Sequence, residues 1–336
     1  MFRSSFARLT VIAFVLLPVT AAAEPVKLKF SYFSSDRSAI YTTTIKPFVD
    51  AVNAQAKGLV EIEMYFSGAI GKVLTQEPQL VADGVADMAM IIPGYSPERF
   101  PDNAVIELPG IFRDGAEAAL VYTRLVAAGA LNGYEDFFVI GALASEPQTI
   151  HGRKPIASIA DLRGQTIRAN NRMEATVLKK LGAIPAVLAI NQTTEAISRG
   201  NIDGATLPPA MLFEFGVGRV ASNHYLLQMT CAPIAIVMNR KKFESLPAEA
   251  QAIIREHSGE WLAKENNKAM DAINRQVVDR LLADPKRKVV VPSQSDLEIG
   301  QRTFDIIIEE WAASNPRNHA LLGLVKAELA KLRSAN

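Results

Sequence analysis

The sequence predicts an α/β protein of two lobes, and three observations lead to this fold class. The chain has 336 residues, more than one hydrophobic core usually serves, and 49% of them are apolar. Strand patterns alternate with helical patterns along nearly the whole chain. One helix-and-strand unit also occurs twice, about 116 residues apart. Each lobe is therefore expected to contain one copy of that unit.

The first 23 residues are typical of an export signal. Arg3 and Arg8 form a basic start, residues 9–17 are apolar, and residues 21–23 are alanines where a signal peptidase cuts. A membrane anchor is the alternative, although an apolar run of about ten residues is half of the roughly 20 that cross a bilayer. We therefore expect a protein that is exported to the periplasm after cleavage of this segment.

Composition argues against several classes of function. Without residues 1–23, the chain has 34 basic and 35 acidic residues, a balance that offers no basic face to nucleic acid. The four histidines lack the spacing of a metal site, and neither a nucleophile motif nor a phosphate-binding loop is present. Cys231 is the only cysteine, so the chain has no internal disulfide. We expect no nucleic-acid partner, no metal, no cofactor and no enzymatic activity.

The first elements are expected as a strand, a helix, a strand and a helix, at residues 26–33, 39–56, 59–66 and 77–83. In the second strand, Val60 and Ile62 alternate with Glu61 and Glu63. This period of two predicts one buried and one wet face, which is typical of an outer strand.

The C-terminal third is expected to be mainly helical. Residues 247–282 have a helical pattern in which Gly259 is the only weak point. One helix of that length would measure roughly 50 Å, enough to cross both lobes. A last strand at residues 289–291 and two closing helices, at 296–313 and 318–332, complete the chain.

The repeated unit spans residues 80–94 and 196–210, each of which passes through a helix, a glycine, an aspartate, a short strand and a proline. Gly84 and Gly200 are typical of left-handed residues that end helices, and Asp87 and Asp203 stand where the strands begin. Because ligands bind beyond the carboxyl ends of strands in open α/β sheets, we expect the two strand ends to face each other across a cleft. Chance similarity between two such units is the alternative.

Arg168 is the strongest candidate for a binding residue. It stands at the end of a short strand, residues 165–169, just before a helix whose start carries Asn171 and Glu174 at capping-box spacing. A guanidinium fork beside a helix N-terminus suits a carboxylate, and we expect Asn171 and this N-terminus to assist Arg168 in binding one. On spacing alone, a solvated arginine at a strand end is the favoured explanation.

Apolar and aromatic residues near the other strand ends are candidates for the walls of the same cleft, because binding pockets combine apolar walls with few polar anchors. Each of them, taken alone, also fits a core position. The candidates are Phe33, Tyr41, Pro93, Tyr95, Ile190, Leu207 and Phe213.

Seven blocks along the chain resemble, in order, the substrate-binding component of TRAP transporters, the DctP-like family. They are VKLKFSYF, SGAIG, VADGVADMAM, GYSPERFPDNAVIELPGIF, KPIASIADLRGQTIRA, LGAIPAVLAINQTTEAISRGNIDGATLPPA and IVMNRKKFESLP. The resemblance covers essentially the whole chain after the export signal.

The resemblance implies a two-lobed periplasmic-binding-protein fold, type II-like, with a long helix spanning both lobes. It implies that a small carboxylate is captured between the lobes and handed to a TRAP-type membrane permease. In LRGQTIR the last arginine, Arg168, takes the place of the family's carboxylate-binding arginine. We expect a monomer with residues 24–145 and 234–273 in lobe 1, and 146–233 and 274–336 in lobe 2.

Two departures from the family pattern bear on the ligand. Leu207 stands where many acid-binding members have an asparagine, and Glu146 and Pro147 stand where members that bind sialic acid-like substrates have a further arginine. A monocarboxylate, or a small oxo-, hydroxy- or aromatic acid, is therefore favoured over a sugar acid. The alternatives are a binding protein for an uncharged or peptide-like ligand of another transporter class, and an exported lyase or isomerase that uses Asp87, Asp203 or Tyr95.

Overall fold

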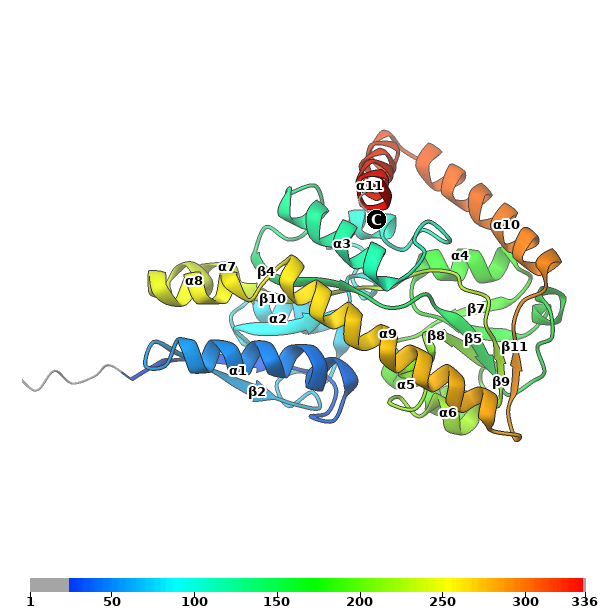
Figure 1. Cartoon of the computed structure of the whole chain (residues 1–336), viewed down its shortest axis with the longest axis horizontal. Coiled ribbons are helices and arrows are strands. Elements are labelled where there is room, and N and C mark those ends of the chain that lie inside the picture. Colours follow the sequence, from blue (N-terminus) through cyan, green and yellow to red (C-terminus); the bar gives the residue numbers. More distant parts are fainter. Residues whose placement is uncertain (1–23, 335–336) are drawn as a thin grey trace, which may run out of the picture.

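The computed structural model describes residues 24–334, and the export signal expected in residues 1–23 lies outside them. Two sheets with helices around them form two lobes, which a long helix joins along one side (Figure 1). This is the two-lobed α/β architecture that the sequence predicts. Within residues 24–334, no helix is both long and apolar enough to cross a membrane.

The first lobe is built on a five-stranded sheet in the order β2-β1-β3-β10-β4. β2 is an edge strand, as its alternating pattern predicts, with Val60 and Ile62 buried and Glu61 exposed. The strands are β1 (Val26–Ser31), β2 (Val60–Tyr65), β3 (Met88–Ile91), β4 (Phe137–Ala144) and β10 (Pro233–Asn239). The helices of this part are α1 (Lys46–Gln55), α2 (Glu77–Ala82), α3 (Gly115–Ala127), α7 (Arg240–Glu244) and α8 (Ala248–Glu256).

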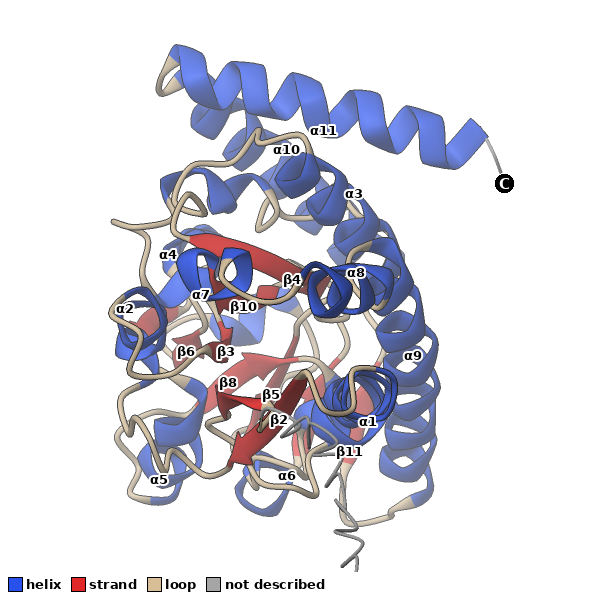
Figure 2. Cartoon of the chain, turned by 90° about the vertical axis from the view of Figure 1, so that its left-hand side faces the viewer, coloured by secondary structure: helices blue, strands red, loops and turns tan. Residues whose placement is uncertain are grey.

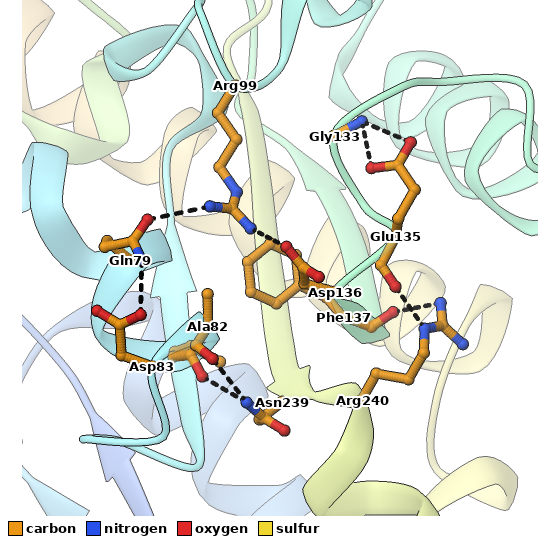
Figure 3. Close-up of polar contacts among 11 residues, drawn as sticks. Gln79, Ala82, Asp83, Arg99, Gly133, Glu135, Asp136, Phe137, Asn239 and Arg240 are labelled. Carbon is orange, nitrogen blue, oxygen red and sulfur yellow. Dashed lines mark hydrogen bonds and ion pairs between the residues drawn. The ribbon is translucent and has the colours of Figure 1, made fainter.

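Polar contacts fix the end of this sheet that lies away from the second lobe (Figure 3). Arg99 donates to Gln79 at 3.3 Å and forms a 2.7 Å ion pair with Asp136. Arg240 donates to the carbonyl oxygens of residues 135 and 137, and Asn239 donates to those of residues 81 and 82. β10 is thereby fixed to the loop before β4 and to the end of α2.

The second lobe is built on a six-stranded sheet in the order β11-β9-β5-β8-β6-β7. Its strands are β5 (Thr149–Gly152), β6 (Thr166–Ala169), β7 (Ile184–Val187), β8 (Gly204–Leu207), β9 (Asn223–Tyr225) and β11 (Lys288–Val290). Its helices are α4 (Arg172–Lys180), α5 (Ile190–Ser198) and α6 (Val217–Val220).

The sequence repeat corresponds to the same local structure in both lobes. Gly84 and Gly200 have left-handed φ angles of 73° and 78°, as expected for residues that end helices. Asp87 accepts a 2.7 Å hydrogen bond from the backbone of β1, and Asp203 accepts one of 3.0 Å from the backbone of β6. Each aspartate thus anchors a neighbouring strand at the edge away from the cleft, which leaves the enzyme alternative without support from these two residues.

The chain crosses between the two sheets at residues 145–148 and again at residues 226–232. The two crossings run side by side, because Ser145 N donates to Ala232 O at 2.9 Å and Gln148 N donates to Thr230 O at 2.8 Å. Two adjacent extended segments between two packed bodies are the usual geometry of a hinge.

A third connection is the helix α9 (Glu260–Ala283), whose 24 residues span about 36 Å. It contacts both lobes, since Asn266 accepts from Thr44 at 3.0 Å and Asn274 accepts from the amide of Ala210 at 3.0 Å. The expected single helix over residues 247–282 is wrong. Gly259, at φ 69° and ψ −134°, separates α8 from α9, and its amide donates to Ile140 O of β4 at 2.8 Å.

Two long helices close the chain, α10 (Gln294–Ala313) and α11 (Pro316–Ser334). Figure 2 shows α11 lying across one end of the molecule, where it packs on α3. Arg317 and Arg333 fasten it through ion pairs with Asp102 at 2.6 Å and Glu117 at 2.8 Å. Both closing helices agree with the sequence prediction. The residue boundaries expected for the two lobes are not tested by these contacts and stay a prediction.

Candidate functional site

A cavity of about 80 Å³ lies between the two lobes, where both copies of the repeat end. Ile92 and Tyr95 follow β3, and Leu207 and Pro208 close β8, and all four line it. Since one water needs about 10 to 15 Å³ on this scale, the space takes a ligand of several heavy atoms. Most of the wall is apolar, including two side chains from β10 and α9, Ile234 and Met270.

Five of the nine residues predicted from the sequence line this cavity, and four do not. Those in the wall are Phe33, Tyr95, Arg168, Ile190 and Leu207. Those elsewhere are Tyr41, Pro93, Phe213 and Asn171. The predicted roles of all nine in binding are not decided by this placement.

The four residues outside the wall have other neighbours. The Tyr41 ring packs edge-on against Phe66, with ring centroids 4.8 Å apart. Pro93 begins a buried turn after β3. The Arg280 guanidinium lies 4.0 Å from the centroid of the Phe213 ring. Asn171 caps α4 by accepting from the Glu174 amide at 2.8 Å.

Arg168 is the second-last residue of β6 and is buried, with 1% of its surface exposed, so the solvated alternative is wrong. Its guanidinium donates to the carbonyl oxygens of Leu188 at 2.8 Å and Thr206 at 2.9 Å. Its second terminal nitrogen, Nη2, donates to Tyr95 Oη at 3.0 Å and to Asn170 Oδ1 at 2.9 Å. A guanidinium has five N–H groups, so one hydrogen on Nη1 stays free of these bonds.

Asn170 is a wall residue that the sequence reasoning missed. Its Oδ1 accepts from Arg168 and from Tyr95, which fixes the orientation of the amide because an arginine only donates. Its Nδ2 is buried and has no hydrogen-bond partner in the described chain. The signal was available, since residues two apart on a strand face the same way and Asn170 follows Arg168 by two.

Glu174 lies behind this pair and is fully buried. The Thr206 hydroxyl lies 2.5 Å from Glu174 Oε2 and 2.9 Å from the Arg168 carbonyl oxygen. A hydroxyl has one hydrogen, so a protonated Glu174 satisfies both contacts. Burial raises the pKa of Glu174, although the nearby positive charge of Arg168 opposes the shift.

Tyr95 connects the lobes at the cavity. It follows β3 in the first lobe, and its hydroxyl accepts from the Ile190 amide at 3.0 Å and donates to Asn170 at 3.1 Å in the second. Glu214 makes the reverse connection, since it follows β8 and accepts from the Ala39 amide at 3.0 Å. Both contacts form only when the lobes are together, so this structure is a closed arrangement.

Two histidines without a predicted role in the site form a buried pair behind Leu207. His151 Nδ1 and His224 Nδ1 are 2.9 Å apart, and Arg287 lies 3.3 Å from His224 Nε2. Since Arg287 only donates, His224 carries its hydrogen on Nδ1, and His151 donates from Nε2 to Leu207 O at 3.1 Å. The pair contacts the end of β8 from outside the cavity. No spacing of histidines in the sequence predicts it.

Comparison with known proteins identifies the family. The family model of bacterial extracellular solute-binding proteins, family 7 (DctP), matches residues 30–315. A solute-binding protein of Sulfitobacter sp. strain NAS-14.1 is 27% identical over 73% of this chain and 75% of its own length. The C4-dicarboxylate-binding periplasmic protein DctP of Rhodobacter capsulatus is 23% identical over 76% of this chain and 80% of its own length.

Solved structures agree with this match. A TRAP solute-binding protein from an unidentified microbe of a marine metagenome, described as specific for aromatic acid ligands, is 26% identical. It superposes with a TM-score of 0.85 over 91% of this chain and 99% of its own. A protein of Bordetella bronchiseptica, solved with mandelate, is 21% identical with a TM-score of 0.80, over 92% of this chain and 100% of its own.

The resemblance found in the seven sequence blocks is therefore confirmed, together with the two-lobed fold that it implied. The chain belongs to family 7 of the bacterial extracellular solute-binding proteins, the DctP family, whose members serve TRAP transporters.

Proposed function

We propose that this protein captures a small monocarboxylate, most favourably an aromatic acid, between its lobes and delivers it to a TRAP-type permease. It acts in the periplasm as a monomer, after removal of the export signal expected in residues 1–23. Arg168 and Asn170 hold the carboxylate, and Phe33, Tyr95, Ile190 and Leu207 enclose the rest of the ligand.

The observation that carries this proposal is the buried positive charge of Arg168. Its hydrogen bonds go to two carbonyl oxygens, a hydroxyl and an amide, and no carboxylate of the described chain pairs with it. A buried charge without a counter-ion is costly, and the pKa of Glu174 is raised by burial, which favours its neutral form. A ligand carboxylate at the free Nη1 hydrogen and the unpartnered Asn170 Nδ2 would supply both missing partners.

The cavity wall supports a ligand with one acid group on an apolar body. Leu207 lies in the wall, fully buried, and gives the end of β8 an apolar side chain there. A sugar acid brings several hydroxyl groups, each of which costs free energy in an apolar wall unless it is hydrogen-bonded.

The relatives support the same ligand class. The marine metagenome protein, 26% identical to this chain, was solved with meta-hydroxyphenylacetate and, in a second structure at 25% identity, with 3-hydroxybenzoate. Aromatic acids are therefore the first compounds to test.

Thermal shift against a panel of organic acids tests the proposal, with isothermal titration calorimetry for each compound that raises the melting temperature. A ligand at 100 times its Kd stabilises the folded state by about 2.7 kcal/mol, which corresponds to a shift of several degrees. The panel should include benzoates, phenylacetates, small oxo-acids, dicarboxylates and hexuronates. If only uncharged compounds or peptides raise the melting temperature, the proposal is wrong.

Delivery needs its own test. The mature protein, the cognate permease in proteoliposomes and the labelled acid should together give uptake that neither protein gives alone. Uptake that is independent of the binding protein would contradict the second half of the proposal.

A further inference from the structure

A second polar group faces the cavity from the side opposite Arg168. Glu146 lines the cavity with 9% of its surface exposed, and within residues 24–334 its carboxyl group accepts only a long hydrogen bond, from the Gly115 amide at 3.4 Å. Gln148 lines the same wall with 3% exposed, and its Oε1 has no hydrogen-bond partner among residues 24–334. Neither side chain is needed to hold the carboxylate.

Strand order places these acceptors across the cavity from Arg168. In the second sheet β8 lies between β5 and β6, with Thr149 opposite Leu207 and Arg168 opposite Ala205. Neighbouring strands are about 4.8 Å apart, so the chain entering β5 lies about 10 Å from β6. Arg168 and Glu146 both line the cavity, and so does Leu207 of β8, the strand between β5 and β6.

The acceptor end of the cavity is also part of the hinge. Glu146 and Gln148 lie in the first crossing between the sheets, where Gln148 exchanges backbone hydrogen bonds with Thr230 at 2.8 Å and Met229 at 3.0 Å. A ligand group bound here therefore contacts the segment that bends when the lobes close.

The charges around Glu146 favour a donor as its partner. Burial raises the pKa of this carboxyl, the acidic groups Asp114 and Asp271 raise it further, and Arg275 lowers it. The nearby charge is thus mainly negative, and a second anionic group on the ligand would be repelled here. A hydrogen-bond donor on the ligand would instead relieve the weakly partnered oxygens.

We propose that the ligand carries a hydrogen-bond donor, a hydroxyl or an amino group, at the end opposite its carboxylate, and that Glu146 and Gln148 accept it. The ligand class becomes a hydroxy- or amino-substituted aromatic acid. This assignment rests on the proposed capture of a carboxylate at Arg168 and adds the residues that select the far end of the ligand.

Calorimetry on the mature chain with benzoate and its hydroxyl, amino and methoxy derivatives at positions 3 and 4 tests the proposal. Methoxy keeps the shape and removes the donor. We expect at least one hydroxyl or amino derivative to bind about tenfold or more tightly than benzoate and than its methoxy analogue, since a buried acceptor that is left without a donor is costly. The tighter of the two donors then identifies the group.

Glu146→Leu removes the acceptor at similar size, and Glu146→Gln keeps an acceptor oxygen. In Glu146→Leu the preference for the donor should fall to within about twofold, and binding of benzoate to this variant shows that the cavity has folded. Glu146→Gln should retain part of the preference. A preference that survives in Glu146→Leu overturns the proposal, as does equal binding of all derivatives by the unaltered protein. Failure of every acid to bind overturns the capture of a carboxylate as well.

Discussion

Replacing Arg168 by methionine separates the role of its charge in binding from its role in the fold. The change removes the donors to Leu188 O and Thr206 O, and each orphaned carbonyl oxygen costs about 1 to 3 kcal/mol. It also removes a buried cation, whose desolvation costs several kcal/mol. The two effects oppose each other, so the ligand-free protein should lose little stability.

Ligand affinity has no such compensation. The carboxylate would enter an apolar wall without its cation, which costs about 2 to 5 kcal/mol, or a factor of roughly 30 to 5,000 in Kd. Arg168→Lys should fall between, because a lysine keeps the charge but cannot make the four bonds that orient the guanidinium.

The assay is calorimetric titration of the best acid from the panel, with thermal unfolding of each ligand-free variant beside it. Arg163→Met is the matched control, because Arg163 is exposed before the other end of β6 and lies outside the cavity wall. A Kd for Arg168→Met within about threefold of the unaltered protein would refute the reasoning, and so would an equal loss in Arg163→Met.

Three further predictions follow from the same geometry. Asn170→Leu removes the unpartnered amide and should raise the Kd of the ligand, measured by calorimetry, about tenfold or more. Asn171→Ser keeps the cap of α4 and should leave the Kd within about threefold. A larger loss in Asn171→Ser than in Asn170→Leu would contradict this prediction. Gly94→Ala places a Cβ 2.4 Å from Glu107 Oε1 and 3.2 Å from the Cβ of Asn171, which lies across the lobe interface. Ligand binding should therefore weaken about tenfold, with little change in the ligand-free melting temperature. Unchanged binding would argue against closure of the lobes at this point. Burial raises the pKa of Glu107 to about 8 from 4.5, so the folded state retains a proton that the unfolded chain releases. The free energy of unfolding should therefore fall as the pH rises from about 4.5 to 8, by up to about 1.4 kcal/mol per pH unit. In Glu107→Gln the free energy of unfolding should depend less steeply on pH.

Features with a local cause were predictable from the sequence. The alternation of Val60 and Ile62 with charged residues predicted an edge strand, because burial of one face dictates that period. The glycines and aspartates of the repeat predicted matching strand ends, because only a few residue types suit those positions. Arg168 stood out by its place at a strand end before a helix, and the structure places it in the cavity wall.

Features that depend on contacts between distant segments were not predictable. At Gly259 the long helical pattern is interrupted, and the Gly259 amide donates a hydrogen bond to Ile140 O, about 119 residues away. Helical periodicity does not predict that contact. His151 and His224 meet only because β5 and β9 are neighbours in the sheet. Asn171 has the spacing of a cap, and it caps α4 by accepting from the Glu174 amide, outside the cavity wall.

A crystal structure of the mature protein with the tightest acid of the panel tests the role of Arg168 most directly. We expect closed lobes and a ligand carboxylate within about 3 Å of Arg168 Nη1 and Asn170 Nδ2. An acid bound in another cavity, or a carboxylate held in this one by other residues while Arg168 keeps only its bonds to the protein, would contradict it.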